Sequence, residues 1–97
     1  MDDRSELWEV VLTAKTSKAQ RLLPATVRDQ LARLLKEIEF SGPIRRNWKN
    51  FSALSDSTYH CHLKKGRPTY VACWRVEDKK IKLIEVYYVG THEGAPY

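Results

Sequence analysis

The spacing of hydrophobic residues predicts an amphipathic helix in the first half of the chain. From residue 27 to 38 the apolar side chains recur at the i, i+4, i+7, i+8 spacing of one helix face: Val27, Leu31, Leu34, Leu35 and Ile38. We expect Thr26 to be its N-cap, with Asp29 three residues on completing a capping box. The segment 41–43, Ser-Gly-Pro, should end it. A shorter helix, capped by Thr16 or Ser17, is expected to run to about residue 23.

Strand-like runs lie on both sides of this helical region. Residues 7–13 form the first, and residues 58–63, 69–76 and 81–89 form three more, joined by short turns that imply an antiparallel meander. The expected order is β-α-α-β-β-β. We therefore predict one α+β domain over residues 1–97, with two N-terminal helices packed on one face of a small, mainly antiparallel four-stranded sheet. The other face of the sheet is expected to be partly open.

The alternation of side chains along the strands indicates which residues lie on that open face. In the run 59–63, Tyr-His-Cys-His-Leu, successive side chains point to opposite faces. If the apolar residues face the helices, His60 and His62 stand side by side on the open face. On the next strand only one of the two faces carries a charge, so Arg75 is placed beside them.

Three histidines in the last 38 residues concentrate the candidate chemistry, since His92 follows the last strand. Paired imidazoles among cations can supply the base and the acid for attack of an RNA 2′-hydroxyl on its phosphate. The spacing His-x-His with a distant histidine also suits a three-histidine zinc site. A third interpretation is that these are polar residues on a solvated surface. Spacing alone leaves all three open.

Composition limits the class of protein but does not identify it. The 97 residues are 42% hydrophobic and 30% charged, with a net charge of +5, typical of a globular domain that can meet a polyanion. Two cysteines do not make a disulfide framework. The chain shows neither a signal peptide nor an apolar stretch of membrane-spanning length, which predicts a cytoplasmic protein with no membrane partner.

Several segments together resemble the RelE/ParE superfamily of bacterial toxins. The resemblance covers residues 7–97 and rests on the helix opening 26–31, Thr-Val-Arg-Asp-Gln-Leu, the strand pair 59–76, and the closing 88–93, Tyr-Val-Gly-Thr-His-Glu. It implies the RelE-like fold. The RelE, YafQ and HigB branches are messenger-RNA endonucleases, most of them acting at the ribosome. The ParE branch inhibits DNA gyrase and lacks the catalytic set.

The resemblance implies roles for particular residues of this chain. His60-Cys61-His62 stands where RelE-like toxins have Lys-x-Lys, His92 where they have a basic residue or histidine, and Tyr97 where they have a tyrosine. The arginine usual on the central strand is not matched, since Val71 stands there, and Arg67 or Arg75 is the expected substitute. The expected catalytic set is His60, His62, His92 and Tyr97, and the expected phosphate contacts are Lys49, Lys64, Lys65, Arg67 and Arg75. Trp48, among these basic residues, could supply a stacking surface, but core packing is the favoured interpretation.

The expected function is that of a type II toxin that cleaves messenger RNA by metal-independent acid–base catalysis, with no metal or other cofactor. Its partners would be a cognate antitoxin, messenger RNA and the ribosome. Two alternatives stay open: a non-catalytic gyrase-binding toxin of the ParE type, and a zinc-dependent hydrolase using the three histidines.

Overall fold

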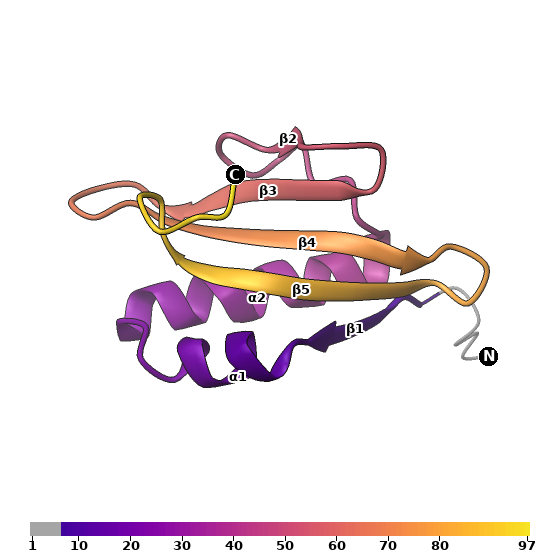
Figure 1. The fold of residues 1–97 in the computed structure, drawn as a ribbon, viewed down its shortest axis with the longest axis horizontal. Coiled ribbons are helices and arrows are strands. Elements are labelled where there is room, and N and C mark those ends of the chain that lie inside the picture. The colour runs from indigo at the N-terminus through magenta and orange to yellow at the C-terminus, as the bar shows by residue number, and fades with distance from the viewer. Residues whose placement is uncertain (1–6) are drawn as a thin grey trace.

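The computed structural model describes residues 7–97, and over these residues two helices cover one face of a five-stranded sheet (Figure 1). The strands are β1 (Glu9–Leu12), β2 (Ser52–Ala53), β3 (Thr58–Lys64), β4 (Tyr70–Asp78) and β5 (Leu83–Thr91). The helices are α1 (Ala14–Gln20) and α2 (Ala25–Ser41). The α+β architecture with both helices on one face is confirmed. The prediction missed the two-residue strand β2.

The sheet order is β1-β5-β4-β3-β2, so the first strand lies at one edge, next to the last. β1 runs parallel to β5, with Glu9 opposite Leu83, while the other three pairings are antiparallel. The segments β3, β4 and β5 form the predicted meander. No helix among residues 7–97 is both long and apolar enough to span a bilayer.

The hydrophobic core lies between α2 and the sheet, as the periodicity of residues 27–38 predicted. Val27, Leu34 and Ile38 of α2 are fully buried, together with Trp74 of β4 and Ile84 of β5. The indole Nε1 of Trp74 donates to the carbonyl of Pro43, 3.1 Å away. This bond satisfies the one polar atom that the ring takes into the core.

Both helices begin at residues other than those predicted. The Thr13 side chain caps α1, accepting from the backbone N–H of Thr16 at 3.1 Å, so Thr16 is inside the helix and is buried. At α2 the N-cap position is Pro24, whose carbonyl accepts from Val27 and Arg28, both at 2.9 Å, without any side-chain cap. The prediction that Thr26 caps α2 is therefore wrong, because the carbonyl of Pro24 supplies the first acceptor two residues earlier.

The end of α2 agrees with the prediction from Ser-Gly-Pro. Gly42 has φ +91°, a backbone conformation that residues with a side chain rarely adopt. Its N–H donates to the carbonyl of Ile38 at 2.8 Å. A Cβ at this position would lie 3.1 Å from Nε1 of Trp8. The glycine thus both ends the helix and admits the indole that precedes β1.

Candidate active site

Alternation along β3 places the two histidines on the face away from the helices. Cys61 and Leu63 are buried in the core cluster and Tyr59 packs against it. His60 and His62, which alternate with these residues, therefore point to the opposite face. This confirms the predicted face of both imidazoles.

A β-bulge adds two tyrosines to this face. Cys73 pairs with Tyr88, but Trp74 pairs with Val86, so Tyr87 is the extra residue in β5. Val86 and Val89 both belong to the core, so the two tyrosines between them both lie on the open face. Sequence alternation could not assign them, since adjacent residues of a regular strand point to opposite faces.

The C-terminal tail, residues 92–97, turns back over the open face toward β3 (Figure 1). The backbone N–H of His92 donates to the carbonyl of Thr69 at 2.8 Å, which holds the start of the tail against the β3–β4 hairpin. The backbone N–H groups of Gly94 and Ala95 then donate to the carbonyls of Thr91 and His92, at 3.1 and 3.2 Å. These bonds form the turn that carries Tyr97 back across the sheet.

Four rings close into a circuit on this face, with two from β3 and two from the tail. Ring centroids are separated by 6.2 Å between His60 and His62 and by 5.6 Å between His62 and His92. The circuit continues at 6.0 Å from His92 to Tyr97 and at 4.6 Å from Tyr97 back to His60. The structure therefore brings together all four residues that the sequence singled out as the catalytic set.

The two β3 histidines differ in exposure, although they lie side by side. His60 is only 9% exposed, with Tyr97 against it and its Nδ1 3.0 Å from the hydroxyl of Ser52 in β2. His62 is half-buried, and its Nδ1 is enclosed without a hydrogen-bond partner among the described residues. Because Nδ1 is enclosed, a ligand would contact this imidazole through Nε2.

Burial and neighbouring charges alter the acid–base properties of this cluster. Burial lowers the pKa of His60, with the charge of His92 acting the same way and a hydrogen bond to Ser52 opposing it. Burial also lowers the pKa of His62, helped by the charges of His92, His60 and Lys65. Burial raises the pKa of Tyr97, so its phenol keeps its proton. The lowered pKa values favour the neutral, proton-accepting form of His60 and His62, beside a phenol that keeps its proton.

Tyr88, which the sequence analysis did not single out, braces the base of the tail. Its hydroxyl donates to the carbonyl of Thr91 at 2.8 Å. A Cβ placed on Gly90 or Gly94 would lie 2.7 or 2.8 Å from that hydroxyl oxygen. Gly90 lies within β5 opposite Val71 of β4, and the absence of a side chain there admits the Tyr88 phenol.

The expected cationic residues are spread unevenly around the histidines. Arg67 lines a cavity of about 460 Å³ together with His62, Thr69 and His92, which we call the hairpin cavity. Lys49, Lys64 and Lys65 line a separate cavity on the other side of His62. Both groups of cations are therefore close to the imidazole of His62.

Arg75 lies on the open face, as predicted, but its charge is already paired. Its guanidinium is 2.7 Å from a carboxylate oxygen of Glu77 and 2.8 Å from one of Glu85. It also lies 4.4 Å from the ring centroid of Tyr87. Two carboxylates would have to be displaced before a phosphate could bind there, so Arg67 is the arginine that the structure leaves beside the imidazoles.

The three histidines do not form a metal-binding cluster in this arrangement. Among residues 7–97 no three His, Cys, Asp or Glu side chains are grouped so that they could hold one ion. The ring separations of 5.6 and 6.2 Å instead suit groups that act on different atoms of one substrate.

Comparison with known proteins connects this fold to small bacterial toxins. No protein-family model matches the chain, and no curated protein matches it significantly. Among solved structures, a doubly substituted E. coli toxin RelE in the free state is 26% identical, with a TM-score of 0.69 over 92% of this chain and 87% of that one. The intact E. coli RelBE toxin–antitoxin complex contains a chain 25% identical, with a TM-score of 0.58 over 86% of this chain and 94% of that one.

An archaeal RelE–RelB complex from Pyrococcus horikoshii has the same fold at 15% identity, with a TM-score of 0.63 over 92% of this chain and 99% of that one. Two helices against a mixed five-stranded sheet thus give this chain a RelE-like fold. The neighbours at 25–26% identity are RelE toxin structures, and they support placing this chain in the RelE/ParE-like toxin superfamily.

Proposed function

We propose that this protein is the toxin of a toxin–antitoxin pair and that it cleaves messenger RNA without a metal ion. The observation that carries the proposal is the closed circuit of His60, His62, His92 and Tyr97, because a gyrase-binding toxin would not require a cluster of proton-transfer groups. Solved relatives that are toxin–antitoxin complexes support the antitoxin as a partner of this chain too. The ribosome is the proposed place of action.

In the proposed reaction the 2′-hydroxyl of one nucleotide attacks the adjacent phosphorus. The new O2′–P bond forms as the P–O5′ bond breaks, giving a 2′,3′-cyclic phosphate and a free 5′-hydroxyl. His62, whose lowered pKa keeps it neutral, accepts the proton of the 2′-hydroxyl, and His92 donates a proton to the departing O5′. Arg67, in the same cavity, stabilises the charge on the phosphate oxygens.

His60 and Tyr97 complete the proposed site from the side of the tail. Tyr97 contacts His60 at 4.6 Å and lies 6.0 Å from His92, so it can orient the substrate and hold the tail in place at once. Because His60 is buried and bonded to Ser52, its proposed task is to support Tyr97 and to tune the charge on His62.

The test is induced expression in a bacterial host, combined with cleavage of RNA by the purified protein. We expect the unmodified chain to stop growth and to degrade messenger RNA. His62→Gln should lower cleavage about 100-fold with little change in Tm, since it removes the proposed general base that lines the hairpin cavity. Lys79→Gln, in the exposed β4–β5 turn, is the matched control and should leave cleavage unchanged.

Two outcomes would contradict the proposal. RNA cleavage that survives in both His62→Gln and His92→Ala would remove the imidazoles from the chemistry. Growth arrest that persists in those variants while messenger RNA stays intact would instead indicate a non-catalytic toxin, such as one that binds gyrase.

A further inference from the structure

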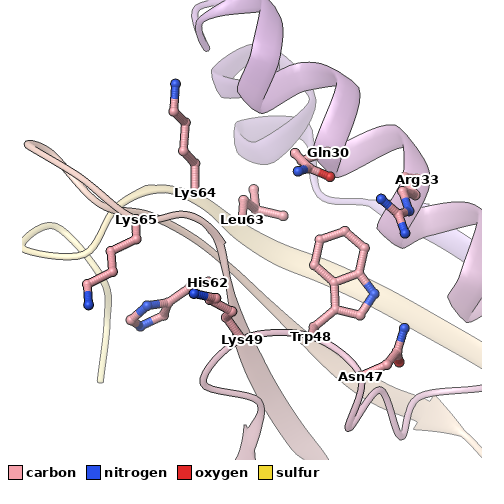
Figure 2. Close-up of a pocket in the computed structure, with 9 residues that line it drawn as sticks. All are labelled: Gln30, Arg33, Asn47, Trp48, Lys49, His62, Leu63, Lys64 and Lys65. Carbon is pink, nitrogen blue, oxygen red and sulfur yellow. The ribbon is translucent and has the colours of Figure 1, made fainter.

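A cavity at the outer edge of β3 is not used by the proposed reaction. It has a volume of about 330 Å³ and lies between α2, the segment 47–49 and the end of β3 (Figure 2). Its volume falls in the range of pockets that hold small molecules, roughly 300–1,000 Å³. We call it the edge cavity, and its wall is completed by Arg33, Asn47, Trp48, Lys49, His62 and Lys65.

The side chains of this cavity match the parts of a nucleotide. Four of its described lining residues are cations and none is a carboxylate. Arg33 is paired with Glu37 at 3.6 Å and lies 5.8 Å from the Trp48 ring centroid, so Lys49, Lys64 and Lys65 are the cations that suit a phosphate. Trp48 supplies an aromatic ring, and the amides of Gln30 and Asn47 can both donate and accept hydrogen bonds. Single-stranded RNA is recognised by this combination of stacking, polar contacts to base edges and basic residues.

The wall that carries Trp48 is held in place by one carboxylate on α2. A single oxygen of Glu37 accepts from the indole Nε1 of Trp48 and from the amide of Asn47, both at 2.9 Å. Hydrogen bonds to Asn47, Trp48 and Arg45 together keep the pKa of Glu37 low, against the opposing effect of burial. The aromatic ring and the amide are thus positioned before any ligand binds, which lowers the entropy cost of binding.

The cavity shares His62 with the hairpin cavity on its other side. The backbone N–H of His62 donates to the carbonyl of Lys49 at 2.8 Å, which fixes the cavity wall to the strand that carries the imidazoles. His62 also lines the hairpin cavity beside Arg67 and His92. One strand of RNA can therefore pass over His62 with one nucleotide on each side of it.

We propose that the edge cavity binds a single nucleotide of the RNA, next to the phosphate held at His62. Its base lies against Trp48 and its own phosphate lies on Lys49 and Lys65. The inference rests on the proposed ribonuclease function, and it adds a binding subsite that would give the toxin a preference for one base beside the cleaved bond. Figure 2 shows Trp48 between Asn47 and Leu63, on the side of the cavity opposite Lys65.

The three tryptophans of the chain allow a direct test by NMR. The probe is a tetranucleotide of 2′-O-methyl RNA, which lacks the nucleophile and cannot be cut. On titration into the full chain, the indole N–H signal of Trp48 should move in proportion to bound ligand. The signals of Trp8 and of the buried Trp74, whose indole is bonded to Pro43, should stay in place as internal controls.

A pair of charge reversals tests the phosphate contact with the same probe. Lys49→Glu should raise Kd about tenfold or more, because it removes a charge-assisted bond and adds repulsion. Lys79→Glu makes the same change in net charge in the exposed β4–β5 turn, and should raise Kd about twofold at most. Equal losses from the two variants would mean only long-range attraction and would overturn the inference.

The remaining outcomes separate this inference from the proposed function. No binding of the probe, or saturation with no movement of the Trp48 signal, would overturn the edge cavity even if the protein cuts RNA. Movement of Trp48 with an acidic peptide but not with the probe would assign the cavity to a protein partner and overturn it too. A Trp48 shift in a chain that does not cut RNA would support the cavity and contradict the ribonuclease proposal alone.

Discussion

The buried ring of His60 makes the stability of this protein depend on pH. Burial lowers the pKa of His60, and of its neighbour His62, below the ordinary histidine value of 6.5. The unfolded chain then binds more protons than the folded chain in this range, so the free energy of unfolding rises with pH. Stability is complete above the unfolded pKa, falls as the pH drops through about 6.5, and levels off once the folded imidazoles are protonated as well.

We therefore predict that urea unfolding gives a lower free energy of unfolding at about pH 5 than at about pH 8. In His60→Gln the free energy of unfolding should change less between these two pH values, since one of the two imidazoles with a lowered pKa is gone. Carboxylates titrate at lower pH and contribute little here. A slope that is unchanged in His60→Gln would show that other groups cause the pH dependence.

The segment between α2 and β2 depends on one acidic side chain for its conformation. Glu37 accepts from Asn47 and Trp48 at 2.9 Å and from Arg45 at 3.4 Å, joining the irregular residues 45–48 to the helix. Removing this acceptor leaves the half-buried donors of Arg45 and Trp48 without it, whereas the exposed amide of Asn47 can bond to water. The helix and the loop therefore form one structural unit around this carboxylate.

We predict that Glu37→Ala lowers the free energy of unfolding by about 1–3 kcal/mol. The matched control is Glu39→Ala on the same helix, whose carboxylate is 3.7 Å from exposed Lys36 and should cost at most about 0.5 kcal/mol. Denaturant unfolding followed by tryptophan fluorescence measures both. Equal losses from the two substitutions would contradict the role assigned to Glu37.

The C-terminal tail both completes the proposed site and covers part of the sheet. Val71 and Cys73 are fully buried although neither belongs to the core under the helices, so they are covered from the open face. Burial raises the pKa of the Cys73 thiol to about 12, which keeps it unreactive at neutral pH. We expect loss of the tail to expose apolar surface without unfolding the domain, because the helices and strands lie before it in the chain.

Ending the chain after Thr91 should abolish RNA cleavage while the circular dichroism of the helices and sheet is retained. The Tm should fall by a few degrees, as expected from roughly 1 kcal/mol of lost burial. Alkylation of Cys73 should become about tenfold faster or more, because its cover is gone. Cys61 lies in the core under the helices, so its alkylation should stay slow. A fast reaction at Cys73 alone would show that the change is local.

A Cys73→Ser substitution in the shortened chain is the control for this assignment and should remove the fast-reacting thiol. Cleavage at the full rate by a folded, shortened chain would exclude both His92 and Tyr97 from the mechanism. Equal alkylation rates for the full and shortened chains would show that the tail does not cover Cys73.

As a whole the molecule carries a net charge of +5, and its proposed site combines imidazoles, a phenol and Arg67. These groups suffice for transfer of a phosphate to its own 2′-hydroxyl, so we predict full RNA cleavage in the presence of EDTA. The check is a cleavage assay before and after chelation, with metal analysis of protein purified without a histidine tag. Stoichiometric zinc, with activity lost on chelation and restored by zinc, would favour the hydrolase alternative.

The features that the sequence predicted are those set by local backbone geometry. The apolar stripe of α2, the stop at Gly42, and the common face of His60 and His62 follow from the repeat of a helix or a strand, and all three are confirmed. The resemblance to RelE-like toxins added the position of Tyr97 near the histidines, which spacing alone could not supply.

Where the sequence offered several residues for one structural role, such as a helix cap, only the packing of the folded chain determined which is used. Thr13, Thr16 and Ser17 are all good helix caps, and Thr13 is used because its strand ends there, beside β5. The bulge at Tyr87 likewise depends on the pairing of β4 with β5, which no local pattern specifies. These contacts join residues distant in sequence, so their energies do not appear in any short window.

For the same reason, the sequence predicted which residues lie at the candidate site but not the environment of each side chain. The sequence placed His60 and Arg75 on the open face, but the fold buries one under Tyr97 and pairs the other with Glu77 and Glu85. A side chain's face is set by its own strand, whereas its burial, partners and charge are set by segments that arrive from elsewhere in the chain. For this protein the local pattern indicated where the candidate site lies, and long-range packing determined which of its side chains are paired or buried.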